Sequence, residues 1–481
     1  MTPQLCSSLQ NSYNIIIGSI EDRMNSYDLL VLGSGSAGLY GAIKAAQLGA
    51  RVALVEGADV GGTCPNRGCL PTKHLVTAAE RYYYSQSDAF RGVKPRKARL
   101  NFAAVMAEKE AVVRYARAEK ERMIAAQPSL DFIRGTGRLV SPHHVAIDGQ
   151  PVTADHILLA TGSSPIVPPI PGLADAFPLN SDRVQVITRL PPRLIVIGGG
   201  EIGLEYGQLF LHFGTKVTVL EKEARILPRE EPEISSALRR YLEEEGMEIQ
   251  TGVDVEAAEP LPRRRAYRVT ARRGEERLSF DSAAIFVATG RRPNTDGLGL
   301  EEVGVNRRED GAVETTAAFE TSHSHIFAAG DVRGPVRMLS SIADREGELA
   351  AENALRGTRH TMEPLGIPYA ILTSPQAASV GLKEAEARAA GYRLRQVDLS
   401  LPEELPKATA DRGWVKLVVE EGSHRILGVH LLAAKAAEAI HEGVFIVKSK
   451  LTVEEVCRTV HVYPTVAESI LRAAEAYPKA A

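Results

Sequence analysis

Two cysteines close together in the sequence carry its clearest chemistry. Cys64 and Cys69 lie five positions apart in GGTCPNRGCLPTK, residues 61–73, with glycines on both sides. Because glycine permits tight backbone bends, one turn can bring the two sulfurs within bonding distance. Such a pair is suited to a disulfide that opens and closes, which is redox chemistry.

The residues after Cys69 favour a reactive thiolate. Pro71 suits the first position of a helix, and a helix that starts there places Lys73 one turn beyond Cys69. A helix N-terminus and a nearby cation both lower the pKa of a cysteine. We therefore expect a stabilised thiolate at Cys69.

Two other uses of the cysteines are open but less favoured. A structural zinc site needs four closed ligands, and Cys6 and Cys457 supply no cysteine or histidine pair at metal spacing. His323 and His325 would share one face of a strand, but no carboxylate or third histidine is close, so we expect no metal site. An inert disulfide is the other alternative, although closely spaced cysteines in an intracellular enzyme are more often catalytic or metal-binding.

A glycine-rich turn precedes the cysteines. An apolar strand expected over residues 27–32 leads into GSGSAG, and a helix over 37–48 and a strand over 51–55 follow. The glycines are Gly33, Gly35 and Gly38. Glycines in such a turn let the backbone approach a pyrophosphate at the helix N-terminus. Glu56 ends the second strand, 23 residues after Gly33, where a carboxylate accepts hydrogen bonds from an adenosine ribose.

The same pattern recurs in the middle of the chain. A strand over 193–197, the turn GGGEIG, a helix and a strand over 216–220 follow one another. The glycines are Gly198, Gly200 and Gly203, and Glu221 lies 23 residues after Gly198. Two copies predict two dinucleotide sites. Glu221 would accept from a free 2′-hydroxyl and repel a 2′-phosphate, which favours NADH over NADPH, although Lys222 and Arg225 could hold a phosphate.

These motifs resemble those of the class I flavoprotein (pyridine nucleotide) disulfide reductases, which include lipoamide dehydrogenase, glutathione reductase and mercuric reductase. The resemblance implies an α/β fold with two Rossmann-like dinucleotide-binding domains, for FAD and NAD(P), and a C-terminal α+β dimerisation domain. It implies a homodimer whose active site is completed by the partner's C-terminal domain. The expected parts are a loose tail over 1–26, the FAD domain over 27–170, the NAD(P) domain over 171–289, a return to the FAD-binding central domain over 290–362, and the interface domain over 363–481.

The resemblance also implies roles for single residues. Electrons pass from NAD(P)H through FAD to the disulfide, where Cys69 matches the thiolate against the flavin and Cys64 the outer sulfur that exchanges with substrate. Lys73 matches the lysine beside the flavin, and Glu205 matches its carboxylate partner. The other expected cofactor contacts are Gly62, Thr63, Thr161, Gly162, Ser163, Asp331, Met338 and Leu339 for FAD, and Gly290 at the end of the NAD(P) domain.

The segment RTVHVYPTVAE, residues 458–468, departs from most of the family. In lipoamide dehydrogenase and glutathione reductase a histidine precedes Pro-Thr and a glutamate five positions on holds it. Here Tyr463 and Glu468 occupy these places, and His461 falls two residues early. A tyrosine, with a pKa of about 10, exchanges protons with thiols at neutral pH less well than a histidine with a pKa of about 6.5. Mercuric reductase also has tyrosine here, since a soft metal ion bound by thiolates needs less proton shuttling.

A second departure leaves the electron acceptor open. Mercuric reductases end with a metal-collecting cysteine pair, whereas this chain ends AEAYPKAA, and Cys457 would be a buried apolar residue on a helix. The sequence thus favours a mercuric reductase-like enzyme, with a dihydrolipoamide dehydrogenase-like or other disulfide reductase as the alternative. A flavin-binding interaction module without turnover is a third hypothesis, which intact Cys64, Cys69 and Lys73 disfavour.

Composition agrees with a multidomain enzyme in a reducing compartment. The 481 residues suffice for about three domains. The 57 basic and 60 acidic residues nearly balance, so neither nucleic acid nor a membrane surface is an expected partner. The four cysteines and the absence of a signal-peptide pattern predict a cytoplasmic protein, and Met24 is a candidate start. Further expected elements are helices over 72–85, 101–127, 435–448 and 465–476, a hairpin of 131–140 with 143–147, and strands over 156–160, 414–419 and 426–432.

Overall fold

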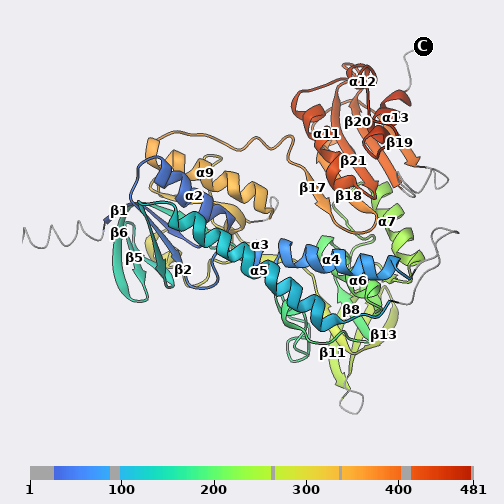
Figure 1. Ribbon diagram of the computed structural model, residues 1–481, viewed down its shortest axis with the longest axis horizontal. Helices are drawn as coiled ribbons and strands as arrows, with labels where there is room; N and C mark the ends of the chain where they lie inside the picture. The colour runs from blue at the N-terminus through green and yellow to red at the C-terminus, as the bar shows by residue number, and fades with distance from the viewer. Residues whose placement is uncertain (1–25, 87–97, 262–265, 335–337, 402–412, 478–481) are drawn as a thin grey trace, which may run out of the picture. The chain divides into compact units, whose positions relative to one another are not determined.

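The computed structural model describes residues 26–86, 98–261, 266–334, 338–401 and 413–477 (Figure 1). The chain divides into two compact units, each assembled from three separate segments. The first unit contains residues 1–70, 111–164 and 291–362, and the second contains 71–110, 165–290 and 363–481. Most of the predicted tail, with Cys6 and Met24, lies outside the described residues.

A seven-stranded sheet forms the centre of the first unit, with the order β3-β2-β1-β6-β5-β4 and β16 beside β6. β1 is parallel to β2 and β6, whereas β4, β5 and β6 form an antiparallel meander. The bounds are β1 Ser26–Leu32, β2 Val52–Glu56, β3 Leu130–Arg134, β4 Gly137–Ser141, β5 His144–Ile147, β6 Gln150–Leu159 and β16 Ile326–Ala328.

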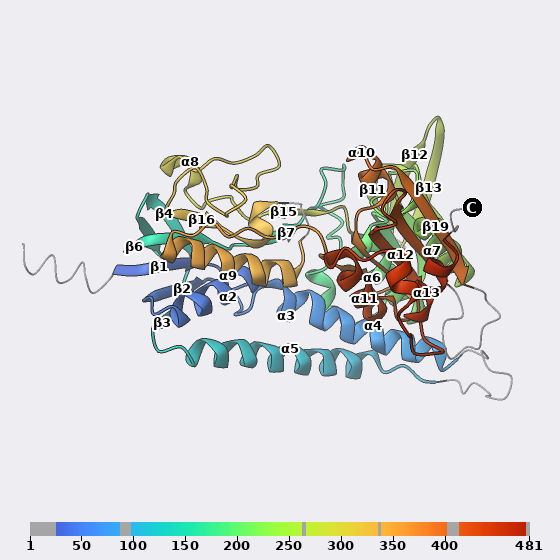
Figure 2. The same cartoon turned by 90° about the horizontal axis from the view of Figure 1, so that it is seen from above.

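Two helices of the first unit, α2 (Ser36–Gln47) and α9 (Ser340–Arg356), lie side by side, as Figure 1 and Figure 2 show. Small residues permit this close approach: a Cβ atom on Gly347 would come within 2.0 Å of the Ala37 carbonyl oxygen. Their apolar faces join one core with the buried strands. The packing places the start of each helix at the carboxyl edge of β1, the edge at which parallel sheets bind ligands.

The second unit contains a four-stranded parallel sheet, ordered β10-β9-β8-β14. Its bounds are β8 Arg193–Ile197, β9 Lys216–Leu220, β10 Glu248–Gln250 and β14 Ala284–Val287. Helix α6 (Glu201–His212) connects β8 to β9, and α7 (Pro232–Glu244) precedes β10. The antiparallel strands β11 (Asp254–Leu261), β12 (Ala266–Arg273) and β13 (Glu276–Ser282) form a separate sheet.

The C-terminal segment of the second unit forms a five-stranded antiparallel sheet, ordered β17-β18-β21-β20-β19. The bounds are β17 Tyr369–Ile371, β18 Gln376–Gly381, β19 Leu394–Leu401, β20 Gly413–Glu420 and β21 Ile426–Ala433. Its helices are α10 Glu384–Ala389, α11 Ala436–Lys448, α12 Val453–Cys457 and α13 Glu468–Glu475. All eight residues of β21 are buried, which marks it as the centre of this sheet.

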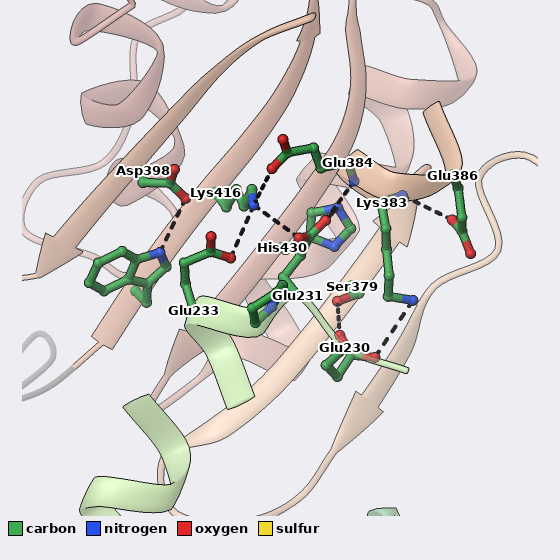
Figure 3. Close-up of polar contacts among 12 residues, drawn as sticks. Glu230, Glu231, Glu233, Ser379, Lys383, Glu384, Glu386, Asp398, Lys416 and His430 are labelled. Atoms are coloured by element: carbon green, nitrogen blue, oxygen red, sulfur yellow. Dashed lines mark hydrogen bonds and ion pairs between the residues drawn. The ribbon is translucent and has the colours of Figure 1, made fainter. Parts of the chain in front are cut away.

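A buried lysine links the start of α7 to the C-terminal sheet (Figure 3). The Lys416 side chain on β20 is fully buried and donates to Glu231 at 2.9 Å, Glu233 at 3.0 Å and Glu384 at 2.9 Å. The Glu384 amide donates to the other oxygen of Glu231 at 2.7 Å. These contacts compensate the desolvation of the charges and fix α7, α10 and β20 against one another.

The predicted mixed α/β class, with two strand–turn–helix–strand units, is confirmed. The helix expected from Pro71 begins earlier: α3 (Thr63–Arg67) has Gly68 as its C-cap, and α4 (Cys69–Tyr84) starts at the next residue. Pro71 is tolerated in the first turn, where amides have no helical acceptor anyway. Helix α5 (Phe102–Ala125) lies within its expected range. The described residues contain no helix with the length and hydropathy that a membrane crossing requires.

Three local predictions are wrong. Residues 131–140 do not form one strand of a hairpin, because β3 pairs with β2 and only β4 pairs with β5. The chain changes direction between β3 and β4, where the Gly135 amide donates to the Glu56 carbonyl and the Thr136 amide donates to the Asp148 carboxylate. Helix α13 begins at Glu468 rather than Thr465. Cys457 ends α12 and is exposed rather than buried.

Candidate active site

The first glycine turn has a geometry that only glycine permits. Gly33 has φ of +100°, and a Cβ atom there would lie 2.4 Å from the Ala160 carbonyl oxygen. A Cβ atom on Gly38 would lie 1.8 Å from the Gly33 oxygen. Gly35 is the N-cap of α2. Gly62 has φ of +66°, and a Cβ atom there would lie 2.6 Å from the Cα atom of Gly35. The turn and the loop before Cys64 therefore approach each other backbone to backbone.

Glu56 closes this turn. Its carboxylate accepts from the Ser34 amide and hydroxyl, both at 2.8 Å, and from the Ala58 amide at 2.7 Å. Ser34 is fully buried, and its hydroxyl also accepts from the Gly61 amide at 3.1 Å. Ser34 thus connects the turn, Glu56 and the loop before the cysteines. The sequence analysis missed this serine, although its place between two of the turn glycines was visible.

The second glycine turn repeats the construction in the second unit. Gly198 has φ of +107°, and a Cβ atom there would lie 2.5 Å from the Ala288 oxygen. A Cβ atom on Gly203 would lie 2.0 Å from the Gly198 oxygen, whereas one on Gly200, the N-cap of α6, would meet open space. Glu221 accepts from the Gly199 amide at 2.5 Å and the Glu223 amide at 2.7 Å. In both turns the carboxylate binds the residue after the first glycine and the residue two places beyond itself.

The first turn fits a dinucleotide. Within the described residues α2 has neither a side-chain N-cap nor an acidic residue in its first turn. Its first amides therefore remain available to an anion such as a pyrophosphate. In the second turn the free space over Gly200 permits a similar approach. Glu56 and Glu221 keep lone pairs beyond the bonds described, so each can also accept from a ribose hydroxyl.

Cys64 and Cys69 lie next to each other in the first unit, and their side chains share a hydrogen bond. Cys64 lies in α3, Cys69 is the first residue of α4, and Gly68 forms the bend between them, where a Cβ atom would lie 3.2 Å from the Cys64 Cα atom. A hydrogen bond with Cys69, followed by burial, raises the pKa of the Cys64 thiol far above its ordinary value. Cys69 is exposed and lies at a helix N-terminus, which favours its thiolate.

A serine that the sequence analysis missed completes this group. The Ser340 hydroxyl lies 3.7 Å from the Cys69 sulfur, within hydrogen-bond range for sulfur, and it also bonds to Cys64. Ser340 is the first residue of α9. It lies directly after Met338 and Leu339, the two partly buried residues expected to border the flavin, and Leu339 is the N-cap of the same helix.

Lys73 and Glu205 form an ion pair in the second unit. The Lys73 ammonium donates to Glu205 at 2.6 Å, and the other carboxylate oxygen accepts from the Leu372 amide at 2.7 Å. Glu205 is mostly buried, so the pair depends on these hydrogen bonds to offset desolvation. The predicted partners of this pair do lie together.

Asp331 contacts the segment Thr161–Ser163, where the chain is expected to pass out of the FAD domain. The Ser163 hydroxyl donates to Asp331 at 2.6 Å, and Arg291 donates to the Ser163 hydroxyl at 2.8 Å and to its carbonyl at 2.7 Å. The Thr161 hydroxyl donates to the Asn294 carbonyl at 2.7 Å, and the Gly162 carbonyl accepts from the Asn294 amide at 2.9 Å. Thr63 starts α3, and Gly290 in the second unit accepts from the Ile166 amide at 3.0 Å.

The residues around Tyr463 have separate partners. Tyr463 is 71% exposed and Glu468 accepts from Arg472 at 2.8 Å, four residues on in α13. Both nitrogens of His461 face oxygen acceptors: Glu442 at 2.6 Å and the Thr459 carbonyl at 3.0 Å.

The contacts of His461 favour its protonated, charged form. Burial alone would lower the pKa of His461, but the hydrogen bonds to Glu442 and Thr459 and the charges of Glu442 and Glu468 outweigh it and raise that pKa. Because a carboxylate and a carbonyl only accept, the protonated form of His461 donates from both ring nitrogens, and in that form it has no lone pair to act as a base.

The described residues hold no group of three or more histidine, cysteine or acidic side chains arranged for a metal ion. His323 and His325 lie in the turn before β16 rather than on a strand, their ring centroids are 5.8 Å apart, and their ring planes meet at 66°. His325 instead stacks on His143 at 4.0 Å. The expectation that the two share a strand face is therefore wrong.

Comparisons with known proteins cover nearly the whole chain. The pyridine nucleotide-disulphide oxidoreductase profile matches residues 27–353, and the dimerisation domain of the same family matches 367–474. A mercuric reductase from Streptomyces lividans is 36% identical over 460 residues, 94% of this chain and 96% of its own. A dihydrolipoyl dehydrogenase from Thermus scotoductus is 34% identical over 466 residues, 95% of this chain and 99% of its own.

A solved structure of a flavoprotein disulfide reductase is also similar to the chain. The HOCl-induced flavoprotein disulfide reductase RclA from Escherichia coli superposes with a TM-score of 0.82 at 27% identity, covering 94% of this chain and all of RclA. Mercuric reductases and dihydrolipoyl dehydrogenases are about equally similar to the chain, so identity alone does not select an acceptor. By both domain matches, the chain is an FAD-containing oxidoreductase of the pyridine nucleotide-disulphide oxidoreductase family with the family's dimerisation domain.

Proposed function

We propose that this enzyme takes electrons from NADH, uses them to reduce the Cys64–Cys69 disulfide, and delivers them to a thiolate-bound soft metal ion, as a mercuric reductase does. The exposed Tyr463 carries this proposal. It stands where disulfide-reducing relatives keep a histidine, and the neighbouring His461 has both ring nitrogens bonded to acceptors. A site without a free imidazole suits an acceptor that needs little proton transfer.

The cysteine pair provides the reactive sulfurs. FAD, when bound, supplies two-electron transfer between nicotinamide and disulfide. The chain's own task is to hold the sulfurs adjacent and to decide which one keeps its proton. The raised pKa of Cys64 leaves Cys69 as the sulfur that ionises first, whereas Cys64 is the sulfur expected to exchange with the acceptor.

The contacts of Glu221 support NADH as the reductant. Its carboxylate is held at the second turn by two backbone amides, where it would repel a 2′-phosphate. The two basic residues that could offset this repulsion have other partners. Lys222 lies 3.5 Å from Asp254, and Arg225 donates to the Pro228 carbonyl at 2.7 Å.

A homodimer accounts for the exposed apolar side chains of the C-terminal segment. Val460, Val462, Tyr463 and Phe445 are 95%, 75%, 71% and 70% exposed. They lie within the match to the family's dimerisation domain. Association through this surface would bury them and place Tyr463 at the partner's cysteine pair, which is the arrangement that the family resemblance implies.

Steady-state assays with NADH test the proposal. The acceptors are Hg(II) with excess thiol, lipoamide, glutathione disulfide and oxygen. We expect Hg(II) to give the highest kcat/KM and Cys64→Ser to abolish that rate. Fast lipoamide turnover by the unaltered enzyme would overturn the reading of Tyr463 and favour the second candidate, a dihydrolipoamide dehydrogenase-like enzyme, which the retained Glu468 supports.

A third hypothesis, a flavin-binding module without turnover, has its own test. NADH added without air to an active enzyme should produce a long-wavelength thiolate-to-flavin absorbance, which Cys69→Ser should abolish. A module without turnover would show no such band in either protein.

A further inference from the structure

One hydroxyl group contacts both sulfurs of the cysteine pair. Ser340 lies 3.7 Å from the Cys69 sulfur and also bonds to Cys64, and all three residues belong to the first unit. Ser340 lies 271 residues after Cys69 in the sequence. It is set at the start of the 17-residue helix α9, whose packing against α2 fixes its position.

The two redox states of the pair differ as hydrogen-bond acceptors. A thiolate accepts a hydrogen bond strongly because it is charged, whereas a disulfide sulfur is a weak, neutral acceptor. A hydroxyl held beside the pair therefore interacts more favourably with the reduced form. The N-terminal end of α9 acts in the same direction, since its partial positive charge favours an anion nearby.

We propose that Ser340 is a positioning residue of the cysteine pair: its hydroxyl donates to the Cys69 thiolate and thereby stabilises the reduced pair over the disulfide. This inference rests on the proposed redox function of Cys64 and Cys69. The Ser340 hydroxyl is a group that lies outside both glycine turns and outside the cysteine motif. Removing the hydroxyl should make the pair easier to oxidise and the disulfide harder to reduce.

Exchange with glutathione measures this preference. Glutathione disulfide accepts two electrons from the two cysteine sulfurs. Its own S–S bond breaks, the Cys64–Cys69 bond forms, and the two thiol protons pass to the two glutathione molecules released. The ratio of reduced to oxidised pair at a known glutathione ratio then gives the equilibrium constant.

The experiment uses the full-length holoenzyme as wild type, Ser340→Ala, Ser340→Thr and Ser341→Ala. Each protein is equilibrated without air in glutathione buffers, quenched in acid and alkylated, and the Cys64 and Cys69 peptides are quantified by mass spectrometry. A peptide without cysteine from the same digest serves as the internal standard, because exposed Cys457 would itself form a mixed disulfide with glutathione. Ser341, the next residue of the same helix, is exposed and provides the matched control.

We expect Ser340→Ala to shift the equilibrium about tenfold toward the disulfide, which corresponds to about 30 mV for a two-electron couple. Ser340→Thr, which keeps the hydroxyl, and Ser341→Ala should stay within about twofold of wild type on the same scale. An unchanged equilibrium in Ser340→Ala would overturn the inference while leaving the proposed function intact. A tenfold shift in Ser340→Thr would also contradict it, so the test holds even if the alanine variant does not fold. A wild-type enzyme that never forms the disulfide would instead overturn the proposed function.

Discussion

The His461 imidazole donates to the Glu442 carboxylate at 2.6 Å, so the loop that carries Tyr463 is fastened to α11 by a charged hydrogen bond. His461 is therefore an anchor for the loop and not a substitute for the histidine that Tyr463 replaces. The same contact makes the stability of the loop depend on pH.

Glu442→Gln should lower the free energy of unfolding by about 1 kcal/mol near pH 6, since the partly exposed carboxylate is screened by water. The pKa of His461 is raised in the folded protein, so this stabilisation is complete below the unfolded pKa of about 6.5 and is lost as pH rises through the folded pKa. Urea unfolding of both proteins at pH 6 and pH 9 measures it. Glu438→Gln, an exposed change on the same helix, is the control, and a difference that persists at pH 9 would argue against the assigned contact.

Lys416→Met should destabilise the C-terminal sheet severely, by about 3–5 kcal/mol, because it leaves Glu231, Glu233 and Glu384 without their shared cation. Burial alone would lower the pKa of Lys416, but the hydrogen bonds that it donates to these glutamates raise it above its ordinary value, so the lysine stays charged at neutral pH. Thermal unfolding monitored by circular dichroism tests this against Lys216→Met, which changes the exposed first residue of strand β9. Equal loss in both variants would show that the cluster has no special role.

Glu205→Ala should leave the Lys73 ammonium without its carboxylate partner, at a cost of about 2 kcal/mol after allowance for the partial exposure of Lys73. We expect guanidinium unfolding to show this loss of stability. If the ion pair lies beside the flavin, the reduction of the enzyme by NADH should also be slower. The control is Glu201→Ala, an exposed residue in the first turn of the same helix. A stability equal to that of the control would mean that the ion pair contributes little.

Glu221→Ala should reduce the preference for NADH over NADPH about tenfold, because it removes the carboxylate that repels a 2′-phosphate. The ratio of kcat/KM for the two reductants, with one fixed acceptor, measures the change. Glu223→Ala alters an exposed side chain of the same loop and should leave the ratio near the wild-type value. A wild-type enzyme that prefers NADPH would reject the interpretation of this turn.

What the sequence predicts well here is local. The glycine turns, the carboxylates of Glu56 and Glu221 that bond to them, and the cysteine loop are contained in short segments whose backbone requirements select glycine at Gly33 or Gly198. Helix α4 begins at Cys69 and not at the expected Pro71, because the bend at Gly68 ends α3 directly before Cys69.

Apart from Ser34, the residues that sequence analysis missed come from distant segments. Ser340 reaches Cys69 only because α9 packs on α2, and Glu442 reaches His461 only through the fold of the C-terminal sheet. Arg291 bonds Ser163 across 128 positions. No spacing rule connects such pairs, and their side-chain types are common in any sequence.

The ratio of kcat/KM for Hg(II) with excess thiol to kcat/KM for lipoamide tests the central claim most directly, measured in the wild type and in Tyr463→His. Val462→His, an exposed change one residue earlier, is the control. We predict that the wild type favours Hg(II) and that Tyr463→His alone raises lipoamide turnover, by roughly a hundredfold if the imidazole restores acid–base catalysis. Rapid lipoamide turnover by the wild type, with no gain in Tyr463→His, would contradict the claim that this tyrosine sets the acceptor.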